Sequence, residues 1–484
     1  MKTDRKLILN IRDIALRDNF TASEKLNFIA LFVLFITLTW NLDNRSIWTS
    51  CFVLIMGTSS LINIKIHETV HPFIIDRLWT KLLCYNLPAI FLLVIYFLSA
   101  LGNCMESISI DGFSYLELKK PENIFSTNVT FKDNWILFLS TVSLFTLSTQ
   151  LLLIPKSFYF LHKFLAWCCT SISFMFLIGA IFKATDLAKP LFSSGTELTN
   201  YFFYFPYDGD WAAFAIIWIY ASYAVSIIEC KKDDREFTKT NAPFYLALCT
   251  ALASTTLLIE QSVSSLFLSF AFVHICFLSY RYLKKQKEPV LKLIGPYILA
   301  LGIGSAVKGC HSFTQIITHN PVTENLKKSG LEMIADSPLF GWGINSFQKL
   351  SPFYNDASLL NQYYETIPSS IINLLCEFGI IGMAIICLYL VILYFQYHKN
   401  KQNNTISDTL FFGLFLIILL SFFDNPFYSI PVAFSFWIIA FLAIRWAQLI
   451  YNQADEVDTS KNIVASDHIR NVPFVTNPKK DVFK

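Results

Sequence analysis

Apolar runs recur along almost the whole chain and are separated by polar intervals. About twelve of them approach the roughly 20 residues that a helix needs to cross a bilayer, if some are short and tilted. The runs lie at 26–40, 47–64, 82–101, 135–153, 164–182, 212–228, 244–258, 262–280, 290–307, 369–395, 409–423 and 427–449. This pattern predicts an all-α polytopic membrane protein with about 12 transmembrane helices. The membrane domain would cover residues 26–449. Around Glu260 one kinked helix in place of two spans stays an alternative, and it would invert the topology downstream.

The composition agrees with a membrane protein. Hydrophobic residues make up 54% of the 484-residue chain, and 47 residues are Phe, which is too apolar for a soluble protein of this length. Charged residues make up 15%, and the formal net charge of +3 is not gathered into a basic cluster. We therefore expect contact with a lipid bilayer and no nucleic-acid partner.

The distribution of lysine and arginine orients the predicted spans. With the N-terminus inside, most of these residues fall in cytoplasmic intervals, as the positive-inside rule requires. Both termini are then cytoplasmic. Residues 1–25 form an N-terminal segment without the features of a cleaved signal peptide, and residues 450–484 form a flexible tail. The intervals 102–134, 183–210 and 308–368 lie on the outer face, and 308–368 is the large loop.

The most informative polar stretch is the signature loop, residues 337–347, inside that large interval. Pro338, Gly341 and Gly343 predict a tight turn that presses backbone amides toward a ligand. Trp342 and the two apolar residues before Gly341 are expected to anchor the loop on a membrane surface. An ordinary surface or re-entrant turn is the alternative interpretation.

Two segments of the chain resemble a known family. Residues 332–343 (EMIADSPLFGWG) and 346–347 resemble the signature of the O-antigen ligase and polymerase superfamily of bacterial inner-membrane glycan transferases. Residues 377–382 (EFGIIG) resemble the motif that follows in that family. Together they cover roughly residues 308–394, and a weaker resemblance lies at 205–214.

This resemblance implies a reaction at the periplasmic face of a bacterial inner membrane. The family moves a glycan from an undecaprenyl-pyrophosphate carrier to a hydroxyl of another glycan, of lipid A core or of a protein, without a metal or nucleotide cofactor. Such a transfer needs cations for the pyrophosphate leaving group and a base for the proton of the acceptor hydroxyl. The implied function is a ligase or polymerase of lipid-linked oligosaccharide in lipopolysaccharide or exopolysaccharide biosynthesis.

The chain departs from the family at the expected arginine and histidine positions. It reads Ile-Pro-Ser-Ser at 367–370, where relatives carry a histidine, and Glu-Gln-Ser-Val at 260–263, where a Ser-Arg pair is usual. A pyrophosphate clamp on the outer face therefore depends on one arginine and on lysines, which bind phosphate as point charges. The candidates are Arg45, Lys308, Lys327, Lys328 and Lys349, each of which is otherwise a solvated loop residue.

Three residues are candidates for the base. His311 and His319 lie on the predicted outer face, and an imidazole pKa near neutrality suits proton transfer, although a loop histidine without a role is the alternative. Glu377 belongs to the second motif and lies in an apolar run, where an ionisable residue is often functional. Its alternative role is structural, in bonding backbone amides or capping a helix. His274, alone in an apolar run, is expected to be a packing residue.

A zinc-like pattern is present but is set aside. His67 and His71 flank Glu68 at the spacing of zinc proteases. Pro72 follows directly, and no third ligand is evident. The cysteines contain no Cys-x-x-Cys pair. We therefore predict neither a metal nor another cofactor.

Two other functions stay open. The departures from the family favour a catalytically silent relative that binds lipid-linked glycan or scaffolds an assembly complex. A polysaccharide transporter or flippase is less favoured, because the chain has no repeat and no pair of Gly/Pro-interrupted helices in matching halves. The sequence does not fix the donor sugar, the acceptor, the choice between ligase and polymerase, or the oligomeric state.

Overall fold

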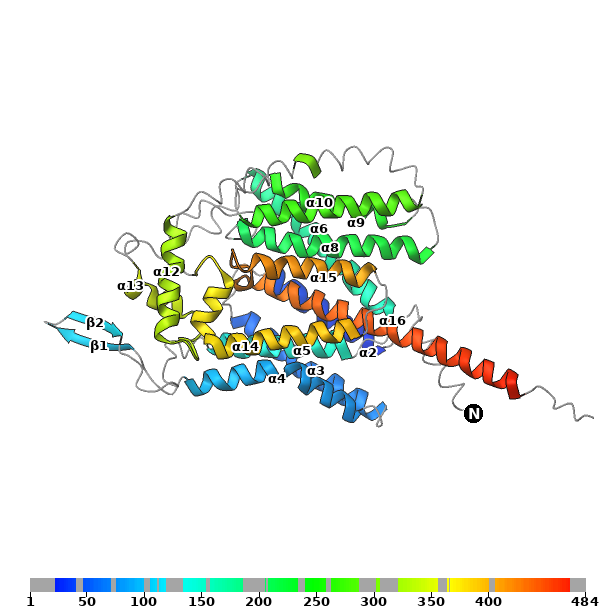
Figure 1. Ribbon diagram of the computed structural model, residues 1–484, viewed down its shortest axis with the longest axis horizontal. Coiled ribbons are helices and arrows are strands. Elements are labelled where there is room, and N and C mark those ends of the chain that lie inside the picture. Colours follow the sequence, from blue (N-terminus) through cyan, green and yellow to red (C-terminus); the bar gives the residue numbers. More distant parts are fainter. Residues whose placement is uncertain are drawn as a thin grey trace, which may run out of the picture.

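The computed structural model describes residues 22–40, 47–70, 75–99, 105–110, 113–118, 134–153, 157–185, 205, 208–233, 240–257, 263–286, 302–304, 321–355, 364, 366–399 and 405–470. Helices dominate these residues (Figure 1). They are α2 (Ala22–Trp40), α3 (Ile47–Val70), α4 (Ile75–Ser99), α5 (Asn134–Leu147), η3 (Ser148–Leu153), α6 (Phe158–Thr185), α8 (Asp208–Asp233), α9 (Ala242–Ser254), η5 (Thr255–Leu257), α10 (Val263–Gln286), α12 (Pro321–Asp336), α13 (Ser346–Tyr354), α14 (Ser370–Lys399), α15 (Thr405–Leu420), η7 (Pro426–Tyr428) and α16 (Ile430–Arg470). Between α4 and α5, strands β1 (Met105–Ile110) and β2 (Phe113–Leu118) form an antiparallel hairpin.

Among the described residues, 6 helices are long and apolar enough to cross a membrane. They contain Trp135–Leu152, Phe158–Ile181, Gly209–Cys230, Val263–Arg281, Ser370–His398 and Ile430–Ile450. Shorter apolar helices lie at Ser50–Ile62, Leu82–Val94, Ala242–Leu257 and Thr405–Leu420. Every predicted run overlaps a described helix except 290–307, which lies outside the described residues apart from a helical piece at 302–304. The chain is therefore a helical protein suited to a bilayer.

The helices on either side of Glu260 distinguish two helices from one kinked helix, although Glu260 itself lies outside the described residues. Helix α9 and its extension η5 end at Leu257, and α10 begins at Val263. Both α9 and α10 pack on α8 (Figure 1). The chain forms two helices at this point rather than one kinked helix.

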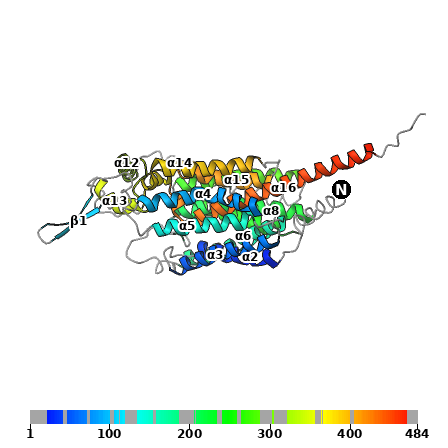
Figure 2. The same ribbon diagram turned by 90° about the horizontal axis from the view of Figure 1, so that it is seen from below.

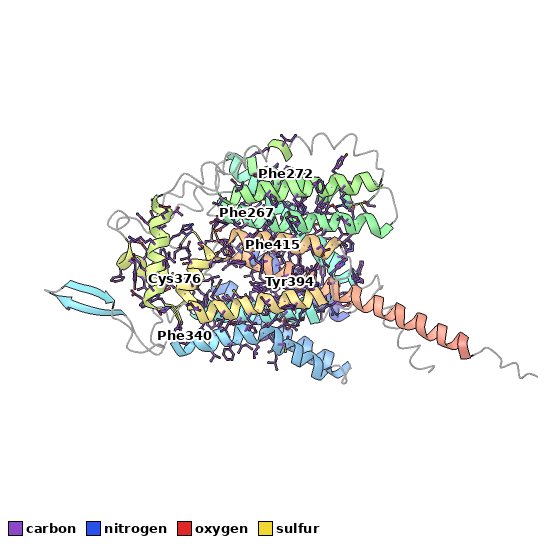
Figure 3. The ribbon with its side chains drawn as sticks, in the orientation of Figure 1. Phe267, Phe272, Phe340, Cys376, Tyr394 and Phe415 are labelled. Carbon is purple, nitrogen blue, oxygen red and sulfur yellow. The ribbon has the colours of Figure 1, made fainter. Side chains whose placement is uncertain are left out.

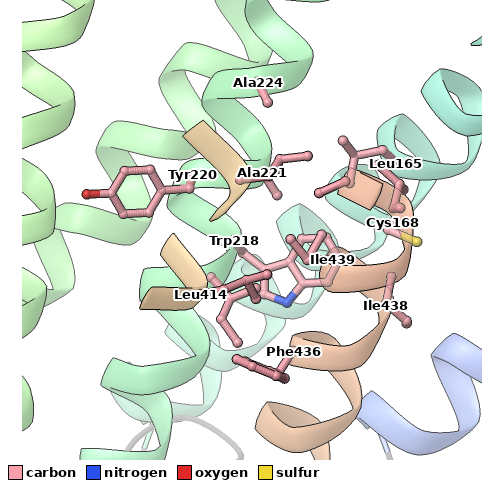
Figure 4. Close-up of a cluster of buried hydrophobic side chains, with 14 of the residues drawn as sticks. Leu165, Cys168, Trp218, Tyr220, Ala221, Ala224, Leu414, Phe436, Ile438 and Ile439 are labelled. Atoms are coloured by element: carbon pink, nitrogen blue, oxygen red, sulfur yellow. The ribbon is translucent and has the colours of Figure 1, made fainter. Parts of the chain in front are cut away.

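Helix α8 lies at the centre of the bundle. Its residues 211–228 are all buried, and it packs against α6, α9, α10, α15 and α16. A helix that is apolar around its whole circumference needs neighbours on every side. The indole of Trp218 belongs to the same buried cluster as Leu414 and Ile439 (Figure 4), and its Nε1 donates to Ser435 Oγ at 3.1 Å.

The outer helices expose large apolar side chains. Leu26, Phe174, Phe277 and Phe395 are each more than half exposed. They come from α2, α6, α10 and α14, so the exposed apolar surface is spread over several helices. Such a surface is unfavourable in water and is covered by lipid tails in a bilayer.

Three local features differ from the sequence expectation. The interval 102–134 contains the β1–β2 hairpin, so the fold is helical with a small sheet rather than all-α. Residues 148–153 form the π-helical turn η3. Helix α16 continues to Arg470, so residues 450–470 are helical, and residues 471–484 lie outside the described part; the flexibility of the tail stays a prediction. This extension lies at the opposite end of the molecule from β1, β2 and α13 (Figures 1 and 2).

Candidate functional site

Residues 321–355 form a cap at one end of the bundle. Helix α12 crosses the ends of the bundle helices, and α13 lies beside it (Figure 1). The cap has an apolar core of its own, separate from the core of the bundle. This core contains Leu326, Met333, Trp342, Phe347 and Leu350 of the cap, together with Ile367 and Cys376. Figure 3 shows Cys376, which lies on α14, beside α12.

The sequence of α12 explains how it reaches α14. Pro321 begins the helix, a position where its missing N–H costs nothing. Leu326, Gly330 and Met333 recur at helical spacing and are buried, whereas the opposite face is exposed and mostly charged, with Leu331 as its large apolar residue. At Gly330 the helix backbone comes so close to α14 that the Cys376 thiol donates to its carbonyl at 3.2 Å.

The signature loop docks into a break in α14. Gly379 has φ 62° and ψ −172°, so the helix is interrupted at this residue. Backbone hydrogen bonds join the loop to α14 on both sides of the break. They run from Trp342 N to Cys376 O (2.8 Å), from Gly343 N to Glu377 O (3.0 Å), from Ile380 N to Pro338 O (2.8 Å) and from Ile381 N to Leu339 O (3.1 Å). The two motifs that the sequence marks separately therefore form one structural unit.

Two glycines make this docking possible. Gly341 and Gly379 have positive φ angles of 67° and 62°. A Cβ on Gly341 would lie 2.5 Å from the carbonyl carbon of Glu377, and a Cβ on Gly379 would lie 2.4 Å from the carbonyl oxygen of Leu339. Any larger residue would push the loop and the helix apart, so both positions require glycine.

One expectation for the signature loop is wrong. Trp342, predicted to anchor on a membrane surface, is 1% exposed and belongs to the cap core, where its Nε1 donates to the Met333 carbonyl at 2.8 Å. The amides of Trp342 and Gly343 donate to carbonyls of α14, and contact of other loop amides with a ligand stays a prediction. Pro338 stays exposed. A tryptophan beside a polar turn looks the same in sequence whether it packs on lipid or on protein.

The carboxylate of Glu377 ties the cap to the bundle. Its side chain is 2% exposed. Oε1 accepts the N–H of Asn345 at 2.8 Å, and Oε2 accepts the hydroxyl of Tyr428 at 2.5 Å. Asn345 immediately precedes α13 and has a φ of 56°, a conformation that Asn adopts more readily than most residues. The structural role predicted for Glu377 is confirmed, and its role as a base stays a prediction.

The starts of three bundle helices meet next to this region. The N–H of Ser370 donates to the Asp424 carbonyl at 2.9 Å, and the Asp424 carboxylate accepts the hydroxyl of Ser264 on α10. The start of α8 is equally near, because a Cβ on Gly209 would lie 2.8 Å from Asp424 Oδ2. Gly209, within the weaker resemblance at 205–214, thus lies beside Asp424, whose carbonyl is bonded to the start of α14. Sequence analysis missed Asp424, although an acidic residue between two apolar runs was a usable signal.

The remaining predicted cations and histidines fall into two groups. Lys327 and Lys328 lie on α12, and Lys349 lies on α13, so these lysines are helical rather than in a loop. Lys328 Nζ is 4.0 Å from Glu332 Oε1, with both side chains more than half exposed, and such a pair adds little stability. Outside the described residues lie Arg45, Lys308, His311 and His319, and also His71 and Pro72 of the zinc-like pattern.

A second contact closes the cap. Asp336 ends α12, and its Oδ2 accepts the hydroxyl of Tyr354, the last residue of α13, at 2.8 Å. Burial raises the pKa of Tyr354 above its ordinary value of 10.0, and the hydrogen bond to Asp336 raises that pKa further. The Tyr354 hydroxyl therefore keeps its proton at neutral pH and links the ends of the two cap helices.

His274 is a packing residue, as the sequence predicted. Its Nδ1 is 2.9 Å from the hydroxyl of Tyr220, and its ring centroid lies 4.3 Å from that of Phe412. These contacts join α10 to α8 and α15 inside the bundle.

The cap, the break in α14 and the polar helix starts thus make one candidate site, built from segments far apart in the sequence. No protein-family model matches the chain, and a search of curated proteins found no match. The resemblance to glycan transferases therefore depends on the short sequence motifs alone.

Proposed function

We propose that the chain is a metal-independent glycan transferase of the O-antigen ligase type. It would transfer a glycan from an undecaprenyl-pyrophosphate carrier at the periplasmic face of a bacterial inner membrane. The observation that carries the proposal is the docking of the signature loop into the break at Gly379, beside the buried Glu377. Two motifs chosen only by resemblance meet in one site.

The proposal includes a topology. About twelve spans would place both termini in the cytoplasm and residues 308–368 in the periplasm, following the distribution of lysine and arginine. The cap then lies on the periplasmic side, and the extension of α16 lies on the cytoplasmic side. The opposite placement of these two parts in Figures 1 and 2 supports this arrangement.

Three lysines of the cap are candidates for binding the donor. Lys327, Lys328 and Lys349 lie on the cap helices, where lysines can meet a pyrophosphate at the membrane surface. Glu377 is buried beneath the signature loop, and a carboxylate there is a candidate for taking the acceptor proton. Lysines on the cap and a carboxylate below it would hold the two substrates at different depths.

Deletion of the gene in its host tests the proposal. Surface glycans would be resolved by size after complementation with the wild type, with Lys327→Ala/Lys328→Ala and with the control Lys25→Ala, an exposed lysine at the start of α2. We expect the high-mass ladder to be lost on deletion, restored by the wild type and the control, and not restored by the double variant at equal membrane abundance. A ladder that persists after deletion would refute the proposed role in that polymer.

A catalytically silent scaffold is the second candidate. The observation that favours it is that both oxygens of Glu377 accept hydrogen bonds from the protein, one from Asn345 and one from Tyr428. A scaffold would bind lipid-linked oligosaccharide without turnover. Transfer by the purified protein in nanodiscs would reject this candidate, and saturable binding without any transferred product would support it.

A further inference from the structure

A row of polar side chains runs along the first half of α14. Ser370, Asn373 and Glu377 are three and four residues apart, so they lie on one side of the helix. Both ends of the row are bonded to the segment before α16. Ser370 Oγ donates to Asn425 Oδ1 at 2.9 Å, and Glu377 Oε2 accepts the hydroxyl of Tyr428 at 2.5 Å. Asn373 lies between these two contacts.

The side chain of Asn373 is buried without a hydrogen bond. Its side chain is 1% exposed, and neither Oδ1 nor Nδ2 has a partner. Nδ2 of Asn425 also has no partner, although its Oδ1 accepts the Ser370 hydroxyl of this row. Buried polar atoms are nearly always paired, because an unpaired one has lost water and gained nothing. The unpaired amide atoms of Asn373 and Asn425 are donors and acceptors with which a polar ligand would form hydrogen bonds.

The surrounding charges determine which kind of polar ligand these amides can bind. Glu377 lies one turn after Asn373, and Asp424 immediately precedes Asn425, whereas the cap lysines are on other helices. An anion such as pyrophosphate would meet two carboxylates here. A neutral hydroxyl instead donates to an amide oxygen and accepts from an amide nitrogen, so it satisfies both ends of an Asn side chain.

We infer that Asn373 and Asn425 bind hydroxyl groups of the glycan acceptor, in a subsite between α14 and the segment before α16. The inference rests on the proposed function and adds the place of the acceptor to it. The start of α13 covers this subsite, because Asn345 is bonded to Glu377. An acceptor sugar therefore enters when the start of α13 moves away from Glu377, and its hydroxyls then replace the missing partners of the two amides.

The test uses the full-length protein in nanodiscs and two matched variants. Asn373→Leu keeps the size of the side chain but removes both unpaired atoms, so the melting temperature should stay equal or rise while sugar binding is lost. Asn86→Leu is the control, because Asn86 is equally buried but its Nδ2 donates to Leu82 O at 2.9 Å and to Ser148 Oγ at 3.0 Å. That control should lower the melting temperature and keep sugar binding.

Binding would be measured by saturation-transfer difference NMR with glucose, galactose and N-acetylglucosamine, and inorganic pyrophosphate would be added as a competitor. We expect a saturable signal from at least one sugar in the wild type and in Asn86→Leu, at least a tenfold weaker signal in Asn373→Leu, and no competition by pyrophosphate. Equal signals in Asn373→Leu, no signal from any sugar in the wild type, or displacement by pyrophosphate would each overturn the inference. A lower melting temperature for Asn373→Leu with unchanged sugar signals would assign an ordered water to Asn373 instead.

The glycan ladder of the host separates this inference from the proposed function. If deletion of the gene leaves the ladder intact, the proposed function fails whatever the NMR signals show. If deletion removes the ladder and Asn373→Leu restores it fully, the acceptor subsite fails and the transferase proposal stands.

Discussion

Replacing Gly379 with alanine tests whether the docked signature loop holds the cap on the bundle. At φ 62° and ψ −172° the backbone occupies a region that is essentially restricted to glycine, and another residue there costs about 1–3 kcal/mol. The added Cβ would also lie 2.4 Å from the carbonyl oxygen of Leu339. This atom belongs to the backbone and cannot rotate away, so the loop and the helix must separate.

The expected cost follows from the contacts that are lost. Separation breaks the backbone hydrogen bonds of Trp342, Gly343, Ile380 and Ile381, each worth roughly 0.5–1.5 kcal/mol. Together with the backbone strain, the cap should lose about 3–9 kcal/mol of local stability. Because the cores of the cap and the bundle are separate, this loss should appear as local opening of the cap rather than as unfolding of the whole protein.

Hydrogen–deuterium exchange with mass spectrometry measures this directly. In Gly379→Ala, peptides that cover residues 338–347 should lose protection, and peptides from α8 should keep it. Gly304→Ala is the matched control, since a Cβ there would meet nothing within 4 Å, and it should change stability by less than about 0.5 kcal/mol. Unchanged protection of residues 338–347 in Gly379→Ala would refute the view that docking holds the cap closed.

Two further changes probe the cap. Trp342→Ala removes a fully buried indole and should lower the local stability of the cap by about 3–5 kcal/mol; exchange protection in the cap equal to the wild type would contradict this. The folded-state pKa of Tyr354 lies above the unfolded value near 10.0, so its stabilising effect is complete below pH 10 and is lost as the pH rises through the folded-state pKa. The advantage of the wild type over Tyr354→Phe in melting temperature should therefore be constant from about pH 6 to 9 and shrink above pH 10; a constant difference up to pH 11 would argue against the assignment.

The helices could be predicted from the sequence because a segment that crosses a bilayer must be apolar for its whole length, whatever it packs against. Helix α8 shows the limit of this signal. Its run predicts a span, but its central position depends on five neighbouring helices from other parts of the chain. The cap was harder to predict, because a helix such as α12, with few apolar residues, resembles a polar loop in sequence.

The site was predicted in part. The motifs marked Gly379 and Glu377, but a glycine inside an apolar run looks like any tolerated helical glycine, and its positive φ follows only from the docked loop. The wrong prediction for Trp342 has the same cause. Its hydrogen-bond acceptor, the Met333 carbonyl, is brought next to it only by the packing of α12 against the signature loop. Asn373 was missed although a signal was present: it lies four residues before Glu377 in an apolar run, which puts two polar side chains on one face.

Glu377→Gln separates the structural role of the carboxylate from a catalytic one. The carboxylate accepts the Asn345 N–H with one oxygen and the Tyr428 hydroxyl with the other. A glutamine has one acceptor oxygen and one NH₂ group. Its oxygen can accept the Asn345 N–H, and its NH₂ group can donate to the oxygen of Tyr428, whose hydroxyl both donates and accepts. The cap should therefore stay closed in Glu377→Gln, with exchange at residues 338–347 close to that of the wild type, whether or not the carboxylate takes part in the reaction.

Glycan transfer by Glu377→Gln resolves the two roles. If Glu377 acts only by holding the cap closed, transfer should persist together with the exchange protection. If the carboxylate takes the acceptor proton, the protection should persist without transfer, because a glutamine is not a base. Wild-type transfer by Glu377→Gln with a measurably loosened cap would contradict both roles, since it would show that transfer needs neither the charge nor the closed cap.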